Sequence, residues 1–523
     1  MLDVVIAVDV GSRQVRAGLF DMAGVTPFTV SEPITLVQLS DVTATYRMHE
    51  IWTVVCSVVR RCAEEAGRCG ARVIGLAFDA TSSLYVDRGG ASLGEGEGDV
   101  FCWMDHRAQA EALEIDATGH AYLDYFGGSI SPEIHLPKIL WLKRNRPDLF
   151  DGSIRFRDVC DELARRATGA DGHSISALVC KWPYIPRRDE PWCKDLLLRL
   201  GLGDGHDPDF VSAPARPLAS VHGTVSATAA DRLGIAAGVV VAVGAIDAEA
   251  GVLGNLRPHF EDTLTRSLIM TGGTSTNFML FAGEKRSVPG VWGPFLDVVF
   301  PGYWMLEGGQ SLSGGALDAI FRQHPASPGD ATPDNHQRVV RDIFELLGGE
   351  GRALGAQKHV VPDWLGNRSP LNNSRVRAIM SGIGQELDYY SLLETYYATA
   401  RGIALQMRHV IEHFHRHGLA IDIVHLSGGH RHNPLLVRLY ADCFHGELAV
   451  TDAPEPVLLG TAMIAAVAAG RYTTLLDAAS HMSAKRTIIA RDERRAARLD
   501  LDYKIYTQLF DARNAIFAAS LSV

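Results

Sequence analysis

The chain has 523 residues, 47% of them hydrophobic and 21% charged, so it exceeds the size at which one core usually stops growing, and two domains of about 200–250 residues each are expected. Its formal net charge of −11 argues against a nucleic-acid partner, because such proteins need basic surface to displace counterions from phosphates. No run approaches the ~18 uncharged apolar residues of a membrane span, and Asp3 and Asp9 interrupt the apolar N-terminus, so a cytoplasmic protein with no membrane partner is predicted.

The N-terminal segment VVIAVDVGSRQVRAGLFD predicts two strands, at 3–9 and 15–21, joined by a polar turn. Gly11 in this turn permits a tight bend, and the hydroxyl of Ser12 and the bare amides can donate to anionic oxygens. Asp9 ends the first strand directly before the turn, where a carboxylate can hold a divalent cation or its water ligands near a nucleotide. The alternative for Asp9 is an ordinary turn aspartate.

Strands and helices alternate through the first half of the chain, which is typical of a mixed α/β layer. The predicted strands are at 73–78 and 83–87, the predicted helices are around 50–68 and 104–115, and a more helical segment follows near 137–200. We expect the last of these to be an insertion that shapes substrate access.

The run GVVVAVGAIDAEAGVLG at 238–254 predicts a buried strand that leads into a helix of small residues. Asp247 ends this strand, and its ordinary role would be a helix N-cap. Small residues such as Gly251 let another segment or a ligand approach the helix closely. We place the domain boundary just after it, which gives domains 1–258 and 259–523.

The stretch SLIMTGGTSTNFML predicts a second hairpin at 267–281. Aligning Gly11 with Gly273 places Ser12 over Thr274 at a separation of 262 residues, half of the chain. A single hairpin of this kind could equally be a plain β-hairpin with no role in binding. Two copies at this offset predict a duplicated domain pair, in which each half presents a phosphate-binding hairpin to a shared cleft.

Two further glycine-rich turns in the second half each connect a strand to a helix. EGGQSLSGGALD offers Glu307 and Gln310 as polar candidates, and LSGGHRHNP offers the backbone of Gly428 and Gly429 together with the side chain of Asn433. Two such turns suit a nucleotide lying on the second domain. The remaining predicted elements are a strand and turn at 296–310, helices near 391–417 and 456–469, strands at 421–427 and near 447–451, and an exposed surface element at 484–498.

His409, Glu412 and His413 form the pattern H-x-x-E-H on a predicted helix, an arrangement found in zinc proteases. The surrounding sequence, TARGIALQMRHVIEHFHRHG, predicts an amphipathic helix on which these groups simply face solvent. We favour the second interpretation.

Over about its whole length the chain resembles the FGGY family of carbohydrate kinases, in the actin-like ATPase superfamily, and most closely its ribulokinase-like branch. The order of many matching stretches makes the resemblance specific, although several would mean little alone. These stretches are DVGSRQVRAGLFD, GLAFDATSSLYV, CWMDHRA, GGSISPEIHLPKILWL, VCKWPY, GAIDAEAGVLG, GGTST, PGYWMLEGGQSLSGG, DWLGNRSPL and LSGGHRHNPLLVRLYAD.

The resemblance implies an α/β fold of two actin-like (ribonuclease H-like) domains flanking a catalytic cleft, with sugar mainly on the first domain and ATP mainly on the second. It implies that Asp247 is the general base and that Asp9 and Asp247 hold magnesium. The matching sugar positions are Asp79, Trp103, Asp105, Lys181, Asp247 and Glu307. The matching ATP positions are Gly11, Ser12, Arg13, Gly272, Gly273, Thr274, Ser275, Thr276, Gln310, Gly314, Gly428, Gly429 and Asn433.

The sequence departs from the family pattern in the first turn, where D-x-G-T followed by a small residue and Ser is common. Ser12, Arg13 and Gln14 occupy these places, so Arg13 either points to solvent or reaches a phosphate. Asn277 after GGTST also replaces what is often Cys.

The activity that the resemblance implies is ATP- and Mg²⁺-dependent phosphorylation of a pentulose at its terminal 5-hydroxyl, with D-ribulose as the expected substrate. L-ribulose and ribitol are alternatives, since one inverted hydroxyl changes only a few hydrogen bonds. An alternative of another class is an actin-like nucleotide-dependent interaction module, and a third is a degenerate, non-catalytic family member. The polar set of Asp79, Lys181 and Glu307 favours the kinase. A homodimer is the commonest assembly by default.

Overall fold

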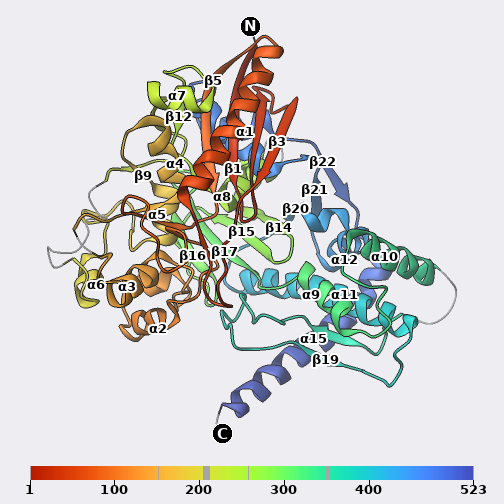
Figure 1. Ribbon diagram of the computed structural model, residues 1–523. Coiled ribbons are helices and arrows are strands. Elements are labelled where there is room, and N and C mark those ends of the chain that lie inside the picture. The colour runs from red at the N-terminus through yellow and green to blue at the C-terminus, as the bar shows by residue number, and fades with distance from the viewer. Residues whose placement is uncertain are drawn as a thin grey trace.

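The structure is a computed structural model that describes residues 2–150, 152–203, 213–256, 258, 260–348 and 354–521. Two seven-stranded sheets organise these residues, and in Figure 1 the N-terminus lies at one end of the molecule and the C-terminal helix projects at the other.

The first sheet belongs to the first half of the chain. Its central strand carries the run Val4 to Val8, in which every residue is buried, so this strand is covered on both faces. The strands lie in the order β11 (Val221–Thr224), β12 (Val240–Ala242), β5 (Ala71–Ala80), β1 (Leu2–Val10), β2 (Gln14–Asp21) and β3 (Phe28–Pro33), and β13 (Ala245–Ile246) also pairs with β5.

The second sheet belongs to the second half of the chain. Its strands lie in the order β16 (Trp292–Leu296), β17 (Trp304–Gln310), β15 (Thr276–Ala282), β14 (Ser267–Gly272), β20 (Ile423–Gly428), β21 (Glu447–Thr451) and β22 (Arg486–Ile489). Thus β22 and the start of α15 occupy the 484–498 stretch, which is therefore the edge of a sheet and not only a surface element.

The two sheets repeat the same pattern of pairing. Each hairpin, β1–β2 or β14–β15, pairs antiparallel with a further strand on one side. On the other side the first hairpin strand pairs parallel with β5 or β20, and that strand pairs parallel with β12 or β21. An antiparallel strand, β11 or β22, ends each sheet on this side. The predicted duplication of an α/β domain is confirmed.

Side chains of the second sheet alternate between two cores. Ile269, Met279 and Met305 pack with the core of the first sheet, whereas their neighbours Met270 and Leu280 pack with a second core. This alternation follows from the two-residue period of a strand. The helices of the second core are α9 (Gly314–Gln323), α10 (Pro333–Gly348), α11 (Tyr389–Arg416), α12 (Pro434–Cys443) and α15 (Glu493–Ser520).

The 137–200 segment and the loops before it form a smaller unit beside the first sheet. Its sheet has the order β4 (Thr45–Tyr46), β7 (Val100–Phe101), β6 (Leu84–Asp87) and β8 (Arg155–Asp158). Its helices are α2 (Gln109–Ala117), η1 (Ala121–Tyr125), α3 (His135–Asn145), α5 (Ile175–Lys181) and α6 (Lys194–Arg199), whereas α4 (Val159–Thr168) packs on β5, β11 and β12 of the first sheet. The helix expected at 104–115 thus begins only at Gln109, because turns occupy 103–108.

Part of the second half returns to the first sheet. Helix α13 (Pro456–Ala468) contacts β1, β5 and β12, and α14 (Leu475–Met482) follows it, while α1 (Met48–Arg68) also packs on β1, β2, β3 and β5. The predicted boundary between 258 and 259 lies partly outside the described residues and stays a prediction. None of the helices within the described ranges is long and apolar enough to cross a membrane.

Helix α13 crosses α8 (Asp247–Asn255) at very short range. A Cβ on Gly254 would overlap the carbonyl oxygen of Pro456, and a Cβ on Gly460 would overlap the carbonyl oxygen of Ala250. The backbones therefore touch directly, because glycine at both positions removes the side chains that would separate them. This contact fixes α8, whose first residue is Asp247, against the first sheet.

We expect Gly460→Ala to destabilise the protein by about 1–3 kcal/mol, because the added methyl must push two helices apart. Gly67→Ala in α1 is the matched control, since a Cβ at Gly67 meets no atom within 4 Å and alanine favours the helix. The measurement is the urea midpoint of each variant, and equal midpoints for the two would contradict the close crossing.

Candidate active site

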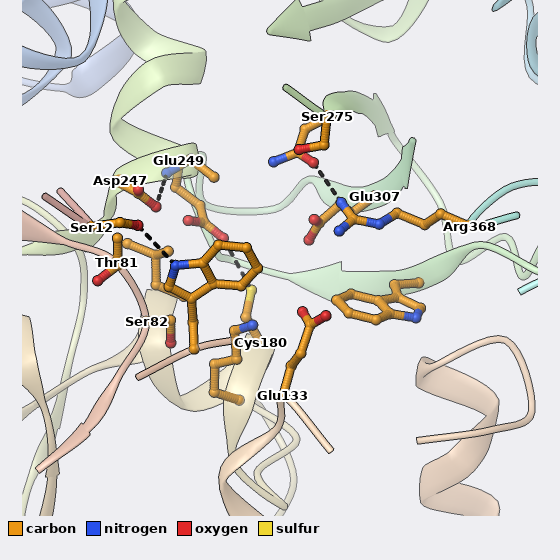
Figure 2. Close-up of a pocket in the computed structure, with 16 residues that line it drawn as sticks. Ser12, Thr81, Ser82, Glu133, Cys180, Asp247, Glu249, Ser275, Glu307 and Arg368 are labelled. Carbon is orange, nitrogen blue, oxygen red and sulfur yellow. Dashed lines mark hydrogen bonds between the residues drawn. The ribbon is translucent and has the colours of Figure 1, made fainter. Parts of the chain in front are cut away.

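A cavity of about 170 Å³ lies between the two halves of the chain, and most of the residues that line it have polar side chains (Figure 2). The first half contributes Ser12, Thr81, Ser82, Trp103, Glu133, Cys180, Lys181, Ile246, Asp247, Ala248 and Glu249, and the second half contributes Ser275, Asn277, Trp292, Glu307 and Arg368. A second cavity, of about 130 Å³, shares Asp247, Ala248 and Asn277 with the first. These shared residues form the wall between the two cavities.

Asp247 is placed in this wall by the start of α8. Its Oδ1 accepts a hydrogen bond from the amide of Ala248 at 2.8 Å, and Ile246 takes the N-cap position. Burial, and then the nearby carboxylate of Asp9, raise the pKa of Asp247 to about 7. A carboxylate with such a pKa is available as a base near neutral pH and can accept a proton from a ligand.

Asp9 lies close to Asp247 at the end of β1 and is only 1% exposed. The hairpin register places Arg16 opposite Asp9, and Nε of Arg16 donates to Oδ2 of Asp9 at 2.7 Å. Arg16 also pairs with Glu455 at 2.7 Å, which joins the first hairpin to the segment before α13. One carboxylate oxygen of Asp9 is therefore already bound to an arginine.

Asp79 lies beside Asp9 on the parallel strand β5. It accepts a hydrogen bond from Thr461 of α13, while its Oδ1 has no hydrogen-bond partner among the described residues. Burial, and then the charge of Asp9, raise the pKa of Asp79 well above its ordinary value. Asp79 is buried beneath the cavity and does not line it.

The carboxylates of Asp9 and Asp247 fit a magnesium site of the kind that protein and substrate share. Mg²⁺ is usually bound through one or two carboxylates together with substrate phosphates, and a cation here would relieve the repulsion from Asp9 that, after burial, raises the pKa of Asp247. Within the part of the chain that the structure describes, no group of three or more His, Cys, Asp and Glu side chains is arranged to hold a metal. The donor set fits a shared ion and not a protein cage.

Four charged side chains gather around Trp292 in another part of the cavity. Lys181 Nζ lies 5.7 Å and Arg368 Cζ 5.8 Å from the centre of the indole ring. Burial raises the pKa of Glu307, and the charges of Arg368 and Lys181 partly offset it. These groups can donate to and accept from a ligand that carries several hydroxyls.

Glu133 completes this group from the loop before α3. Burial opposes its ionisation, but a hydrogen bond from His106 and the charges of Arg368 and Lys181 prevail and lower the pKa of Glu133 to about 2. In Figure 2 the carboxylates of Glu133 and Glu307 extend into the cavity from different segments. Glu133 is therefore a permanent acceptor at neutral pH.

Glu249 adds a carboxyl group whose pKa is shifted in the opposite direction to that of Glu133. Its Oε1 accepts a hydrogen bond from Cys180 Sγ at 3.3 Å, and its Oε2 has no partner among the described residues. Burial, and then the charge of Glu307, raise the pKa of Glu249 to about 8. A protonated carboxyl group can donate a hydrogen bond to a ligand oxygen.

The turn of the second hairpin packs against the start of α9 and the ring of His430. The amides of Ser313 and Gly314 donate to the carbonyl oxygens of Thr274 and Gly273 at 2.8 and 3.0 Å. Nε2 of His430 donates to the oxygen of Gly273 at 2.9 Å, so its Nδ1 accepts from the hydroxyl of Tyr440 at 2.9 Å. Burial lowers the pKa of His430 to about 4 and keeps it neutral.

The glycines predicted to contact the nucleotide lie together at this turn. Gly272 pairs with Gly428 across β14 and β20, and a Cβ on Gly428 would overlap the carbonyl oxygen of Gly272. Gly428 has φ of +75°, which glycine adopts without strain. A Cβ on Gly429 would meet the carbonyl oxygen of Gly272 at 3.8 Å, an ordinary contact, and Ser275 is the member of the turn that reaches the cavity.

Two predicted nucleotide residues have their side chains committed elsewhere. Nε2 of Gln310 donates to the carbonyl oxygen of Ile403 at 2.8 Å, so Gln310 points to α11 and away from the cavity. Asn433 caps α12, with its Oδ1 accepting from the amides of Leu435 and Leu436 at 3.0 and 3.2 Å.

The first hairpin turn reaches the cavity through Ser12. Its hydroxyl accepts a hydrogen bond from Nε1 of Trp103 at 3.0 Å, and its carbonyl accepts from Tyr46 at 3.0 Å. Gly11 closes the turn by donating to Gln14 O at 3.0 Å, and Arg13 is exposed. The structure thus brings Ser12 and Trp103 together.

Asp105 is the second predicted sugar residue that does not line the cavity. It is 0% exposed, and its Oδ2 accepts from the amide of Ala44 at 2.8 Å and from Nη2 of Arg107 at 2.7 Å. It fixes the loop that carries Trp103, which Lys138 also holds by donating to Cys102 O at 2.7 Å.

Sequence reasoning assigned no role to several residues that line the cavity or bind a predicted site residue, among them Arg16, Glu133, Glu249, Trp292 and Arg368. The first, second, third and fifth lie within the stretches that match the family, so their polar character was the available signal. Trp292 lies in none of these stretches, and no pattern in the sequence indicates it.

The H-x-x-E-H residues diverge on α11. His409 is buried, not solvent-facing, with its ring centre 4.6 Å from that of Phe510. Glu412 accepts a hydrogen bond from Arg408 at 2.9 Å, and Nε2 of His413 donates to Pro289 O at 2.8 Å. These contacts give each residue a structural role.

Two family profiles match the chain. The N-terminal domain of the FGGY family of carbohydrate kinases matches residues 4–254, and the C-terminal domain of that family matches residues 268–469.

Named relatives and solved structures agree. An FGGY carbohydrate kinase domain-containing protein of Danio rerio is 35% identical over 511 residues, covering 91% of this chain and 92% of the relative. A D-ribulokinase of Saccharomyces cerevisiae is 32% identical over 511 residues, covering 88% of this chain and 71% of the relative. The crystal structure of xylulose kinase from Rhodospirillum rubrum superposes with a TM-score of 0.81 at 20% identity, covering 98% of this chain and 100% of that one.

We expect His430→Ala to loosen the second hairpin turn, because Gly273 O and the hydroxyl of Tyr440 would both lose their partner, at a cost of about 1–3 kcal/mol. Faster hydrogen exchange at the amides of 272–276 and a lower urea midpoint would report this change. Tyr440→Phe is the matched control, because it leaves the contact with Gly273 intact and should leave exchange at the turn nearly unchanged. Normal exchange in His430→Ala would contradict the role given to this histidine.

Proposed function

Because the chain belongs to the FGGY family of carbohydrate kinases, and so is a phosphotransferase that uses ATP to phosphorylate a sugar hydroxyl, we propose that its acceptor is a pentulose, phosphorylated at the 5-hydroxyl, and that this pentulose is D-ribulose. The observation that carries the proposal is the 32% identity to a D-ribulokinase over 88% of this chain. The mixture of donors and acceptors around Trp292 supports a neutral polyhydroxylated ligand.

Asp247 is the proposed general base. A sugar hydroxyl is a poor nucleophile at neutral pH, and a positioned carboxylate that takes its proton contributes about 10²–10⁴ in rate. The acceptor oxygen bonds to the γ-phosphorus, the bond from that phosphorus to the bridging oxygen of ADP breaks, and the proton passes to Asp247. The position of Asp247 between the two cavities supports this role.

Asp9 and Asp247 are the proposed magnesium ligands, and the bound ion would supply charge neutralisation at the transferred phosphoryl group. The tie between Arg16 and Asp9 holds the carboxylate in one orientation. For the nucleotide, we propose that the turns at Gly11–Arg13 and Gly272–Thr276 contact the phosphates through their backbone, and that Gly314, Gly428, Gly429 and Asn433 border the adenosine. The proposed role of Gln310 is indirect: it holds α11 in place through its hydrogen bond to Ile403 O and does not contact the nucleotide.

Of the predicted sugar residues, we propose direct acceptor contacts for Trp103, Lys181 and Glu307, which line the cavity. Asp79 and Asp105 are proposed as positioning residues. Both are buried; Asp79 lies beside Asp9 and bonds to Thr461 of α13, and Asp105 bonds to the amide of Ala44 and fixes the loop that carries Trp103. We further propose that the reaction takes place in the cytoplasm and that the enzyme is a homodimer, which analytical ultracentrifugation would test.

A coupled assay of ADP release with D-ribulose, L-ribulose, D-xylulose, ribitol and glycerol tests the proposal. D-ribulose should give the highest kcat/KM, and product analysis should locate the phosphate on O5. A higher kcat/KM for L-ribulose or ribitol would make that compound the substrate and leave the proposed reaction type unchanged. If no acceptor raised ADP release above background while ATP controlled polymerisation or the binding of a protein, the actin-like interaction module would be the better assignment.

Asp247→Asn should lower kcat by about 10²–10⁴ with little change in nucleotide affinity, because the amide cannot accept the acceptor proton. Steady-state kinetics and calorimetric titration with ADP measure the two quantities. Unchanged turnover in this variant would remove Asp247 from the mechanism.

The value of kcat/KM should fall as the pH drops below about 7, because the raised pKa of Asp247 leaves it protonated there and unable to act as a base. The apparent pKa is that of Asp247, and saturating Mg²⁺ should shift it downward by favouring the ionised form. A profile measured at two Mg²⁺ concentrations checks both statements. An acid limb that does not respond to Mg²⁺ would contradict the shared site.

A further inference from the structure

Arg368 is the cation that the second half of the chain contributes to the cavity. It lies in the loop between β18 (His359–Val361) and β19 (Ile379–Ser381). Buried Asp363 holds this loop by accepting hydrogen bonds from Asn367 at 3.1 Å and from Arg513 of α15 at 2.8 Å. The loop is therefore anchored, and Arg368 is presented to the cavity from a fixed base.

The guanidinium of Arg368 is largely free to bind a ligand. Its one hydrogen bond to the described residues runs from Nη1 to Oδ1 of Asn277 at 2.5 Å, and it forms no ion pair with them. Figure 2 shows the group beside Glu307 and directed into the cavity. An arginine carries five N–H donors, so several remain for oxygen atoms of a ligand.

The neighbours of Arg368 suit a ligand with adjacent hydroxyls. Glu133 and Glu307 lie near enough for the charge of Arg368 to affect their pKa values, yet neither is paired with it. A hydroxyl can donate to one of these carboxylates while its oxygen accepts from the planar guanidinium. A carboxylate-bearing acceptor would instead meet the charges of Glu133 and Glu307.

Asn277 connects this group to the second hairpin. It follows the turn directly, pairs with Thr271 across β14 and β15, and lines both cavities. Its neighbour Thr276 is bonded to Ser313 at the start of α9 by an oxygen-to-oxygen distance of 2.7 Å. A change in the bond between Arg368 and Asn277 therefore acts on the strand that carries the phosphate-binding turn.

Resting on the proposed kinase function, we propose that Arg368 binds the acceptor and, through Asn277, couples acceptor binding to the second hairpin turn, so that each substrate binds more tightly in the presence of the other. Contact with the acceptor hydroxyls draws Arg368 toward the ligand and alters its hold on Asn277. By thermodynamic linkage, the nucleotide must raise the affinity for the acceptor by the same factor by which the acceptor raises the affinity for the nucleotide.

The test measures binding of a non-hydrolysable ATP analogue with and without D-ribulose by calorimetry, together with steady-state kinetics. In the wild-type protein, saturating D-ribulose should tighten analogue binding by about fivefold or more. Arg368→Gln should raise the acceptor KM by about tenfold or more and bring the coupling factor close to one. Arg368→Lys should restore the acceptor KM in part but should not restore the coupling factor. Asn277→Ala should abolish the coupling with a smaller effect on the acceptor KM.

Arg375→Gln is the matched control, because Arg375 is an exposed arginine of the same loop that lies over Phe517 and outside the cavity. It should match the wild type in both measurements. If Arg368→Gln leaves the acceptor KM unchanged, or Asn277→Ala keeps the full coupling factor, the inference is wrong although the kinase assignment stands. If the wild-type protein phosphorylates no acceptor of the panel, the proposed function fails first and the inference falls with it.

Discussion

The direct backbone contact between α8 and α13 is the constraint on which the site depends. Gly254 and Gly460 let the two helices cross without intervening side chains, and this crossing holds α8, and with it Asp247 at its first position, in the wall between two cavities. Thr461, next to Gly460, bonds to Asp79 and thereby connects the crossing to the carboxylates beneath the cavity. A packing requirement thus determines where the candidate base is placed.

Electrostatics divides the cavity into parts with different tasks. Around Asp247, burial and the repulsion of Asp9 favour the protonated form, whereas near Trp292 the hydrogen bond from His106 and the charges of two cations keep Glu133 ionised. Acidic groups of different proton affinity therefore lie within one small polar space. This is the arrangement expected where some carboxylates exchange protons and others only accept hydrogen bonds.

The sequence predicted the duplicated fold well because hairpins and buried strands leave local signals, namely apolar runs interrupted by glycine and hydroxyl residues. It also predicted Asp247, Lys181 and Glu307 as site residues from stretches similar to known kinases, and these three side chains line the cavity, while their roles stay predictions. It did not distinguish residues that line the cavity from those that support it, as Asp105 illustrates, because burial depends on contacts between distant segments. Trp292 escaped notice for the same reason, since its ring meets Lys181 and Arg368 only in the folded chain.

The return of α13 and α14 to the first sheet means that the polypeptide passes between the two sheets three times: after α8, before α13, and between α14 and β22. Arg486 fastens two of these passages together by donating to the carbonyl oxygens of Gly254 and Leu256 at 3.1 and 2.7 Å. Three neighbouring tethers resist sliding and separation of the lobes and leave rotation as the easiest relative movement. The pivot of that rotation would lie at these passages, so a small swing would displace most the parts of the two lobes that lie farthest from them.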